Sequence, residues 1–345
     1  MDLFSGSGGL STGAVAAGLE VLLGVDSDKW AVDTYSKNFG PTKAKCADLK
    51  VAGEDFFEQL PRCDLLVAGP PCQSFSTSNQ KTRNDSNPLN NLLFVPVLAA
   101  SVIRPTAVVV ENVHGLGIGS RKKYLDELTQ RLQHLGYKRQ VLFVTGRDVG
   151  LPQNRTRLFV VATLTQLSPI KFNSLEQPTF WDATNDLPKL DNGASIDVLP
   201  YSSSPGSEYV EVLRLERSEC SGHLVTNNAP HILERYKCVP AGGNWKSIPE
   251  ELMSNYQDAT RCHTGIYHRL SDDKPAEVVG NFRKNMLIHP TQERGLSVRE
   301  AARLLSFPDS YTFSGSIGKR QQQVGNAVPP LMVTFILDHV VGEVN

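Results

Sequence analysis

A cysteine and an acid stand at the ends of apolar runs, where they could act on a bound ligand. Cys72 lies in GPPCQSFS, at the end of the run of residues 63–70. An ionised thiol there could act as a nucleophile, although most cysteines are small buried hydrophobes. Glu111 ends the run of residues 106–110. A carboxyl group among apolar neighbours could hold a raised pKa and donate a proton.

Two arginines, Arg155 and Arg157, lie two positions apart in QNRTRLFVV. The alternation of a β-strand would point both guanidinium groups to one side of a sheet. This spacing is compatible with a solvated strand face. Beside a thiol and an acid, the pair would instead form a clamp for an anion or a carbonyl group.

A glycine-rich loop opens the chain, MDLFSGSGGLSTG, and Gly6, Gly8 and Gly9 would let its backbone approach a ligand. It is not a P-loop, and Ser11 stands where a dinucleotide-binding loop has its third glycine. Asp26 follows about 20 residues later, where a carboxylate can bind ribose hydroxyls. The pattern favours an adenosine-containing ligand, with a plain tight turn as the alternative.

Two further segments allow two interpretations each. Asp48, in KCADLK, could meet an adenine amino group or be a solvated turn residue. Residues 74–91 are rich in Ser and Asn and carry Lys81 and Arg83. This composition fits a mobile lid over a site or an ordinary surface loop.

These residues need a framework, and apolar runs alternate with helical patterns through the first half of the chain. Strands are expected at residues 1–4, 20–26, 63–70, 106–113, 137–145 and 157–164, and helices at 27–40, 91–103 and 121–135. Further helices are expected at 297–307, where Ser297 and Glu300 have capping-box spacing, and at 328–341. The order predicts an α/β fold with an open parallel sheet and helices on both faces.

The composition limits the possible partners. The formal net charge is -1, so nucleic acid would have to be held by a local cluster of Lys and Arg. No run of 18 apolar residues occurs, and we expect no membrane span. The six cysteines lack paired spacing, which indicates a reducing intracellular setting. We expect a cytoplasmic, nucleoid-associated monomer.

The segments DLFSGSGG, GPPCQSFS, ENV, QNRTR and QVGNAVPP occur in the order found in DNA (cytosine-5)-methyltransferases. The chain resembles that family over nearly its whole length outside an irregular stretch. The resemblance implies a Rossmann-like class I methyltransferase sheet, with S-adenosylmethionine as cofactor and S-adenosylhomocysteine as product. It implies a catalytic domain at 1–164 plus 286–345, and a smaller, irregular target-recognition domain at 165–285.

The same resemblance implies a mechanism on a cytosine that is flipped out of duplex DNA. The Cys72 thiolate would add to C6 of the base, which makes C5 electron-rich enough to take the methyl group. Glu111 would protonate or hydrogen-bond N3. Arg155 or Arg157 would contact the O2 carbonyl and a neighbouring phosphate.

The resemblance also implies binding residues. The cofactor pocket is expected to contain Phe4, Ser5, Gly6, Gly8, Gly9, Leu10, Asp26, Ser27, Asp48, Leu49, Pro71, Leu92, Asn326 and Val328. In the lid, DNA contacts are expected from Gln73, Ser76, Lys81 and Arg83. In the target-recognition domain, candidates for base recognition are Arg214, Arg217, Asn227, Asn228 and Lys246.

Other functions stay open at this point. A tRNA cytosine-5 methyltransferase would typically have Pro-Phe-Thr where this chain has Ser74-Phe75-Ser76. A catalytically silent DNA-binding regulator and a nicotinamide oxidoreductase are further alternatives. A restriction endonuclease is a candidate partner, because DNA methyltransferases protect DNA from such a nuclease in restriction–modification systems. The second half of the chain contains possible zinc ligands, Cys220, His223, Cys238, Cys262 and His263. They lack the paired spacing of a zinc site, and we expect no metal.

Overall fold

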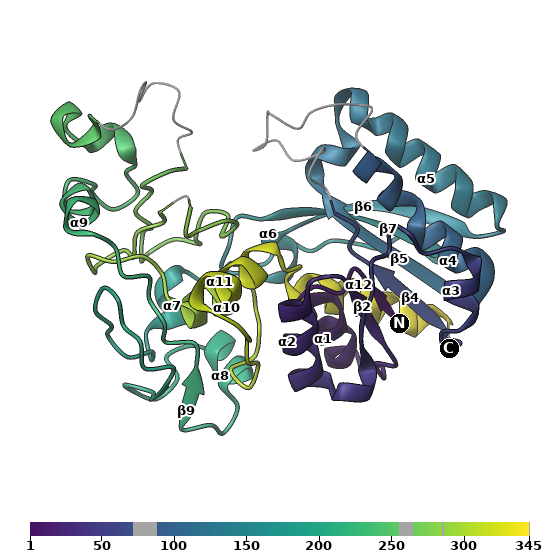
Figure 1. Ribbon diagram of the computed structural model, residues 1–345, viewed down its shortest axis with the longest axis horizontal. Helices are drawn as coiled ribbons and strands as arrows, with labels where there is room; N and C mark the ends of the chain where they lie inside the picture. The colour runs from purple at the N-terminus through teal and green to yellow at the C-terminus, as the bar shows by residue number, and fades with distance from the viewer. Residues whose placement is uncertain (72–87, 255–264, 285, 345) are drawn as a thin grey trace. The chain divides into compact units, whose positions relative to one another are not determined.

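The computed structural model describes residues 1–71, 88–254, 265–284 and 286–344 (Figure 1). The chain divides into two compact units. The first comprises Met1–Val149, Arg155–Ser174 and Val328–Asn345, and the second Gly150–Asn154 and Leu175–Ala327.

The first unit is built on a seven-stranded sheet with strand order β3-β2-β1-β4-β5-β7-β6. The strands are β1 (Asp2–Leu3), β2 (Gly24–Asp26), β3 (Ala44–Cys46), β4 (Leu65–Ala68), β5 (Ala107–Val113), β6 (Lys138–Thr145) and β7 (Thr156–Thr163). The open α/β sheet predicted from the sequence is confirmed.

The expectation of a fully parallel sheet is wrong at one strand. The pairings among β1 to β5 are parallel, whereas β7 runs antiparallel to both β5 and β6. Residues 146–155, which join β6 to β7, contain only the short helix α6 (Gly146–Val149). A parallel return needs a crossover of a dozen or more residues, so this short connection reverses the chain direction.

Helices cover both faces of the sheet (Figure 1). They are α1 (Gly9–Ala16), α2 (Lys29–Phe39), α3 (Glu54–Glu58), α4 (Val95–Ile103), α5 (Lys122–His134) and α12 (Pro330–Val344), with 3₁₀ turns η1 (Pro41–Lys43), η3 (Pro88–Phe94), η4 (His114–Gly117) and η5 (Gly119–Arg121). The helix expected at 91–103 is divided into η3 and α4. The α-helix begins at Val95 because Pro96 lacks an N–H group and fits only the first turn.

A buried hydrogen-bonded chain connects β1, α1 and α2. Ser11 Oγ donates to Asp2 Oδ2 at 2.7 Å and lies 2.6 Å from the Tyr35 hydroxyl. Burial raises the pKa of Asp2 to about 7. The serine in the third glycine position therefore fixes α1 to the first strand, directly behind the glycine loop.

The second unit contains short helices and a two-stranded sheet. Its elements are α7 (Phe180–Thr184), β8 (Val198–Pro200), α8 (Glu208–Arg214), β9 (Glu219–Ser221), α9 (Pro230–Lys237), η6 (Trp245–Ser247), η7 (Glu250–Met253), α10 (Val298–Leu304) and α11 (Ile317–Asn326). The capping box predicted for Ser297 and Glu300 is confirmed at the start of α10.

The second unit also contains helices that the sequence analysis assigned to the catalytic domain. α10 packs against α7 and α11 within this unit. Arg303 of α10 forms buried ion pairs with Asp186, and with Asp309 at 2.6 Å. These contacts explain why the unit continues to Ala327 and does not end near residue 285.

One stretch of the described chain, Ile317–Glu343, has the length and apolar composition of a membrane-spanning helix. It is not one helix, because α11 ends at Asn326 and α12 begins at Pro330. The apolar side chains of α12 pack against α1 in the first unit, and Val333 and Ile336 are fully buried. Their apolar character is that of a protein core.

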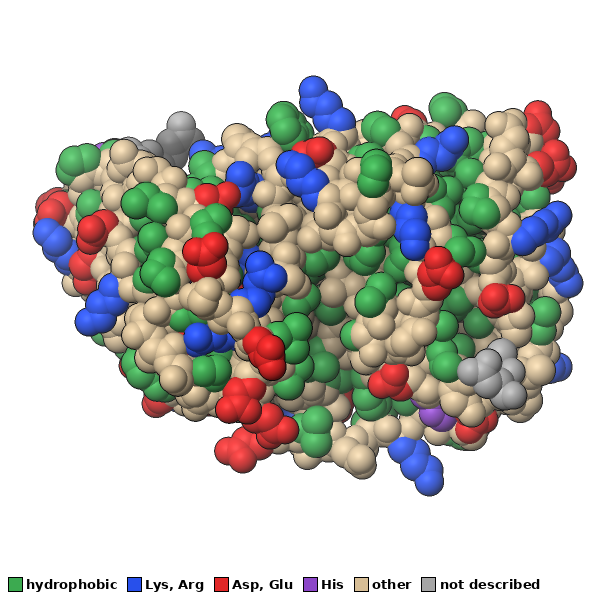
Figure 2. All heavy atoms as spheres, turned by 90° about the horizontal axis from the view of Figure 1, so that it is seen from below, with side chains coloured by type: hydrophobic (Ala, Val, Ile, Leu, Met, Phe, Trp, Pro, Cys, Tyr) green, Lys and Arg blue, Asp and Glu red, His purple; other side chains and the backbone are tan. Residues whose placement is uncertain are grey.

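On the face drawn in Figure 2, acidic and basic side chains are interspersed.

The fully buried Tyr35 ring gives a prediction about stability. A Cβ added at Gly24 would lie 2.2 Å from Tyr35 Cζ. Gly24→Ala should therefore lower the free energy of unfolding by about 1–3 kcal/mol, measured by urea unfolding. Gly342→Ala is the control, because its Cβ meets nothing within 4 Å. That variant should be as stable as the parent or slightly more stable. Equal stability of both variants would contradict the packing described.

Candidate active site

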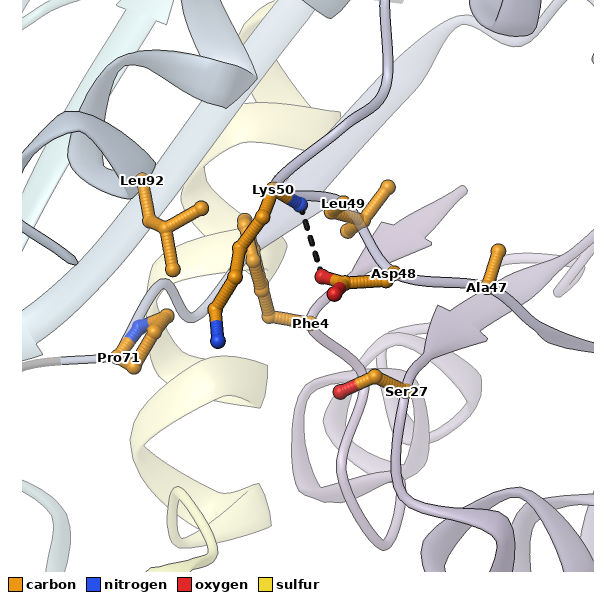
Figure 3. A pocket seen from close by; sticks show the side chains of 8 residues that line it. All are labelled: Phe4, Ser27, Ala47, Asp48, Leu49, Lys50, Pro71 and Leu92. Atoms are coloured by element: carbon orange, nitrogen blue, oxygen red, sulfur yellow. Dashed lines mark hydrogen bonds between the residues drawn. The ribbon is translucent and has the colours of Figure 1, made fainter. Parts of the chain in front are cut away.

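A pocket lies where β1, β2, β3 and β4 end (Figure 3). Its volume is about 240 Å³, which suits part of a small ligand, since pockets for whole ligands start at about 300 Å³. It is lined by Phe4, Ser27, Ala47, Asp48, Leu49, Lys50, Pro71 and Leu92. The fold thus brings together six of the residues predicted for the cofactor, and adds Ala47 and Lys50.

The glycine loop has an unusual backbone. Phe4, Gly6 and Gly8 have φ values of 57°, 51° and 85°, in the left-handed region. For Phe4 this conformation is strained, and such strain is concentrated at functional sites. Gly9 is required for another reason, because a Cβ there would lie 2.3 Å from the carbonyl oxygen of Val328. Val328 is therefore beside the loop, as expected from the sequence.

The other predicted loop residues are buried, Ser5 at 6% exposure and Leu10 at 2%. Asn326 is the last residue of α11 and belongs to the second unit.

The Asp26 carboxylate links the glycine loop to the end of β2. Its Oδ2 accepts from the Gly6 N–H and its Oδ1 from the Asp28 N–H, both at 2.8 Å. Burial raises the pKa of this carboxyl group, which the backbone hydrogen bonds partly offset. A carboxylate has about four acceptor positions, so Asp26 can still accept from two hydroxyl groups.

A second carboxyl group, Glu111, lies in β5 and is only 7% exposed. Arg157 Nε donates to Glu111 Oε1 at 2.9 Å. Burial raises the pKa of Glu111, and the guanidinium groups of Arg157 and Arg155 oppose this rise. Both guanidinium groups therefore act on the acid. The strand alternation expected from their spacing does not hold for Arg155, which precedes β7.

The pocket and the buried acid are neighbours. A Cβ added at Gly69, directly after β4, would lie 3.7 Å from Glu111 Oε2 and 3.9 Å from the carbonyl oxygen of Phe4. Glu111 therefore lies near the backbone of Phe4, one of the residues that line the pocket.

Asn112, for which no role was predicted, is 1% exposed and follows Glu111 in β5. Its Nδ2 donates to the Pro70 carbonyl oxygen at 3.2 Å, and its Oδ1 accepts from the Val113 N–H. This contact fixes the Pro-Pro turn to the end of β5. The only available signal was its position inside the ENV segment.

Several predicted residues lie outside the described part of the chain. They are Cys72, Gln73, Ser76, Lys81 and Arg83, with most of the expected lid. Of the second-half cysteines and histidines, Cys262 and His263 also lie outside it. Cys220 Sγ is 3.3 Å from His223 Nε2, and the described residues contain no group of three metal-ligating side chains.

The candidate residues for base recognition have structural contacts in the second unit. Arg214 donates to Asp186 and to the Ser203 carbonyl oxygen, and it lies over the Tyr201 ring. Asn192 bonds to Asn227 and Asn228 through its side chain. These contacts give Arg214 a structural role within the unit, and base recognition by these residues stays a prediction.

Comparison with known proteins identifies relatives of the whole chain. The family model described as C-5 cytosine-specific DNA methylase matches residues 1–342. The Type II methyltransferase M1.HphI of Haemophilus parahaemolyticus is 33% identical, covering 99% of this chain and 86% of the relative. M.DdeI of Desulfomicrobium norvegicum, also a Type II methyltransferase, is 29% identical, covering 99% of this chain and 88% of the relative.

Solved structures show the same fold. A prophage-encoded E. coli protein, described as a DNA modification methyltransferase, superposes with a TM-score of 0.79 at 24% identity, covering 100% of this chain and 98% of the other. The Entamoeba histolytica methyltransferase EhMeth has a TM-score of 0.67 at 16% identity, with the same coverage.

The Glu111–Arg157 pair predicts a pH dependence. A buried acid with a raised pKa stabilises the fold in its protonated form, and this contribution is lost as the pH rises from 4.5 through the raised pKa. Arg157→Met removes an opposing cation and should move this loss to higher pH. The measurement is the free energy of unfolding as a function of pH. The parent is compared with Glu111→Gln, and Arg157→Met is compared with the double variant that also carries Glu111→Gln. A loss at unchanged or lower pH would refute the assignment.

Proposed function

This chain belongs to the C-5 cytosine-specific DNA methylase family, and from that membership we propose the detailed chemistry of its site. It is a DNA methyltransferase of the kind found in Type II restriction–modification systems. The proposal is that it transfers the methyl group of S-adenosylmethionine to C5 of a flipped-out cytosine in duplex DNA, through a covalent bond between Cys72 and C6.

The pocket residues fit the adenosine part of that cofactor. Phe4, Leu49, Pro71 and Leu92 give apolar and aromatic walls, and Asp48 gives an acceptor for an exocyclic amine. The Asp26 carboxylate, held by two backbone N–H groups, accepts from the ribose hydroxyls. S-adenosylmethionine, when bound, supplies the activated methyl group.

The remaining residues act on the cytosine. The Cys72 thiolate bonds to C6, and the electron pair of the C5–C6 double bond moves to C5, in conjugation with C4 and N3. C5 uses this electron pair to form the bond to the methyl group. Glu111 donates a proton or a strong hydrogen bond at N3, which lowers the cost of this addition. Arg157 and Arg155 keep Glu111 oriented and present cationic donors to the O2 carbonyl. After methylation, a base removes the C5 proton and the carbon–sulfur bond breaks.

One observation carries this proposal. The buried Glu111 carboxyl group, paired with Arg157, lies near the backbone of Phe4, which lines a pocket that suits the nucleoside part of a ligand. A nucleoside pocket alone would suit many cofactors. An acid with a raised pKa next to it adds proton donation to a second, aromatic substrate.

The rest of the proposal concerns DNA. Flipping is required because C5 and C6 are inaccessible in a stacked duplex. The target-recognition role belongs to the second unit. A restriction endonuclease with the same target sequence is the proposed functional partner.

Replacement of the thiol gives the main test. Cys72→Ser should reduce methyl transfer to duplex DNA below detection, and should form no covalent adduct with DNA containing 5-fluorocytosine. Glu111→Gln should lower the rate by about 10²–10⁴-fold. The measurements are incorporation of labelled methyl groups and a gel shift under denaturing conditions.

Cys238→Ser is the matched control, because this cysteine lies in the second unit and donates only to a backbone carbonyl. It should retain full activity. Retention of activity by Cys72→Ser would refute the covalent mechanism, and methylation of tRNA in place of duplex DNA would refute the substrate assignment.

A further inference from the structure

The pocket contains a cation that the sequence analysis did not place there. Lys50 lines it together with Phe4, Pro71 and Leu92. Figure 3 shows the Lys50 side chain extending toward Pro71, with its amine turned away from the Asp48 carboxylate. The long aliphatic stem and the ammonium group are therefore both part of the pocket wall.

The backbone under Lys50 is fixed by a tight turn. The Lys50 N–H donates to Asp48 Oδ1 at 2.9 Å, and the Val51 N–H donates to the Asp48 carbonyl oxygen at 3.3 Å. Leu49, between them, is 3% exposed and packs into the core. The base of the Lys50 side chain is thus held at the pocket edge, while its end can adjust to a ligand.

The ammonium group is available for such a ligand. Lys37 and Lys43 form ion pairs with Asp33 and Glu20. Within the described part of the chain, the Lys50 side chain forms neither an ion pair nor a hydrogen bond. It is also exposed, so its charge has not been taken out of water.

The position of Lys50 decides which part of a ligand it can meet. The glycines of the loop, Gly6, Gly8 and Gly9, are not among the residues that line this pocket. An amino-acid tail held by that loop would lie outside the pocket, whereas a flat heterocycle inside it would lie against Lys50. Ammonium groups are attracted to the faces of aromatic rings, and lysine stems cover apolar surface.

We propose that Lys50 is a binding residue for the adenine ring, with its stem packed on the purine and its ammonium group over the π-face. The proposal rests on the function proposed above, since it takes S-adenosylmethionine as the ligand. Lys50 then contributes to cofactor affinity and not to the chemical step. Phe4 gives the same pocket an aromatic wall.

Two ligands separate the purine from the amino-acid tail. S-adenosylhomocysteine carries both, and 5′-methylthioadenosine has the same adenosine without the carboxylate. Calorimetric titration should show that Lys50→Met, which keeps an apolar stem, binds both ligands about three-fold more weakly than the parent. Lys50→Ala, which also loses the stem, should bind both about ten-fold more weakly.

Lys45→Met is the matched control. Lys45 is an exposed lysine of β3 whose amine lies 5.6 Å from the centre of the Phe56 ring, and it does not line the pocket. Its replacement should change neither affinity.

The outcomes distinguish the two proposals. If the parent protein bound neither ligand, the proposed function itself would fail. If the parent bound both and Lys50→Met bound them equally well, the role of the ammonium group would be refuted. Weakened binding of S-adenosylhomocysteine alone would place the cation at the carboxylate and would also overturn the assignment to adenine.

Discussion

A buried carboxyl group held beside guanidinium groups is the interaction on which the reactive edge of the sheet depends. Burial favours the protonated form of Glu111, while Arg157 and Arg155 favour the ionised form. Without the cations, burial would raise the pKa of the acid further. Without burial, the same cations would lower its pKa. The antiparallel pairing of β7 with β5 sets Arg157 opposite Val113, two residues from Glu111, and so fixes this balance in the backbone.

Two groups of residues lie at different positions along this edge of the sheet. The ends of β3, β2 and β1 form the pocket, and the end of β5 and the start of β7 carry the acid and its cation. β4 lies between these groups of strands, and Gly69 follows it. A Cβ at Gly69 would contact both the Glu111 carboxyl group and the Phe4 carbonyl oxygen at ordinary distances. The acid and the pocket residue Phe4 thus approach the same position after β4. In the proposed reaction, the cofactor and the cytosine would meet on this side of the sheet.

The strands of the sheet could be predicted from the sequence because apolar runs are local signals of buried strands. Asp26, Asp48 and Glu111 were candidates because functional side chains follow strand ends, although position alone left Asp48 open between a ligand contact and a turn residue. The apolar residues of the pocket were expected only from the family resemblance, because they carry no local signal of their own. The antiparallel direction of β7 was missed because it depends on the short connection between β6 and β7. No sequence motif in that connection indicates the direction of the next strand. Lys50 was missed because an exposed lysine after a turn is common, and only the folded pocket shows what its stem covers.

The buried arginines of the second unit show why the charge available for binding cannot be predicted from composition. Arg294, Arg299 and Arg303 are almost fully buried there, and their partners are Glu300, Asp309 and Asp186. Although burial opposes it, the Arg294 guanidinium lowers the pKa of Glu300 to about 2. These cations are paired inside the unit and cannot also neutralise phosphates. A total of 35 Lys and Arg therefore overstates the charge available to DNA. With a net charge of -1, attraction to the duplex must come from a local concentration of the cations that the fold leaves at the surface.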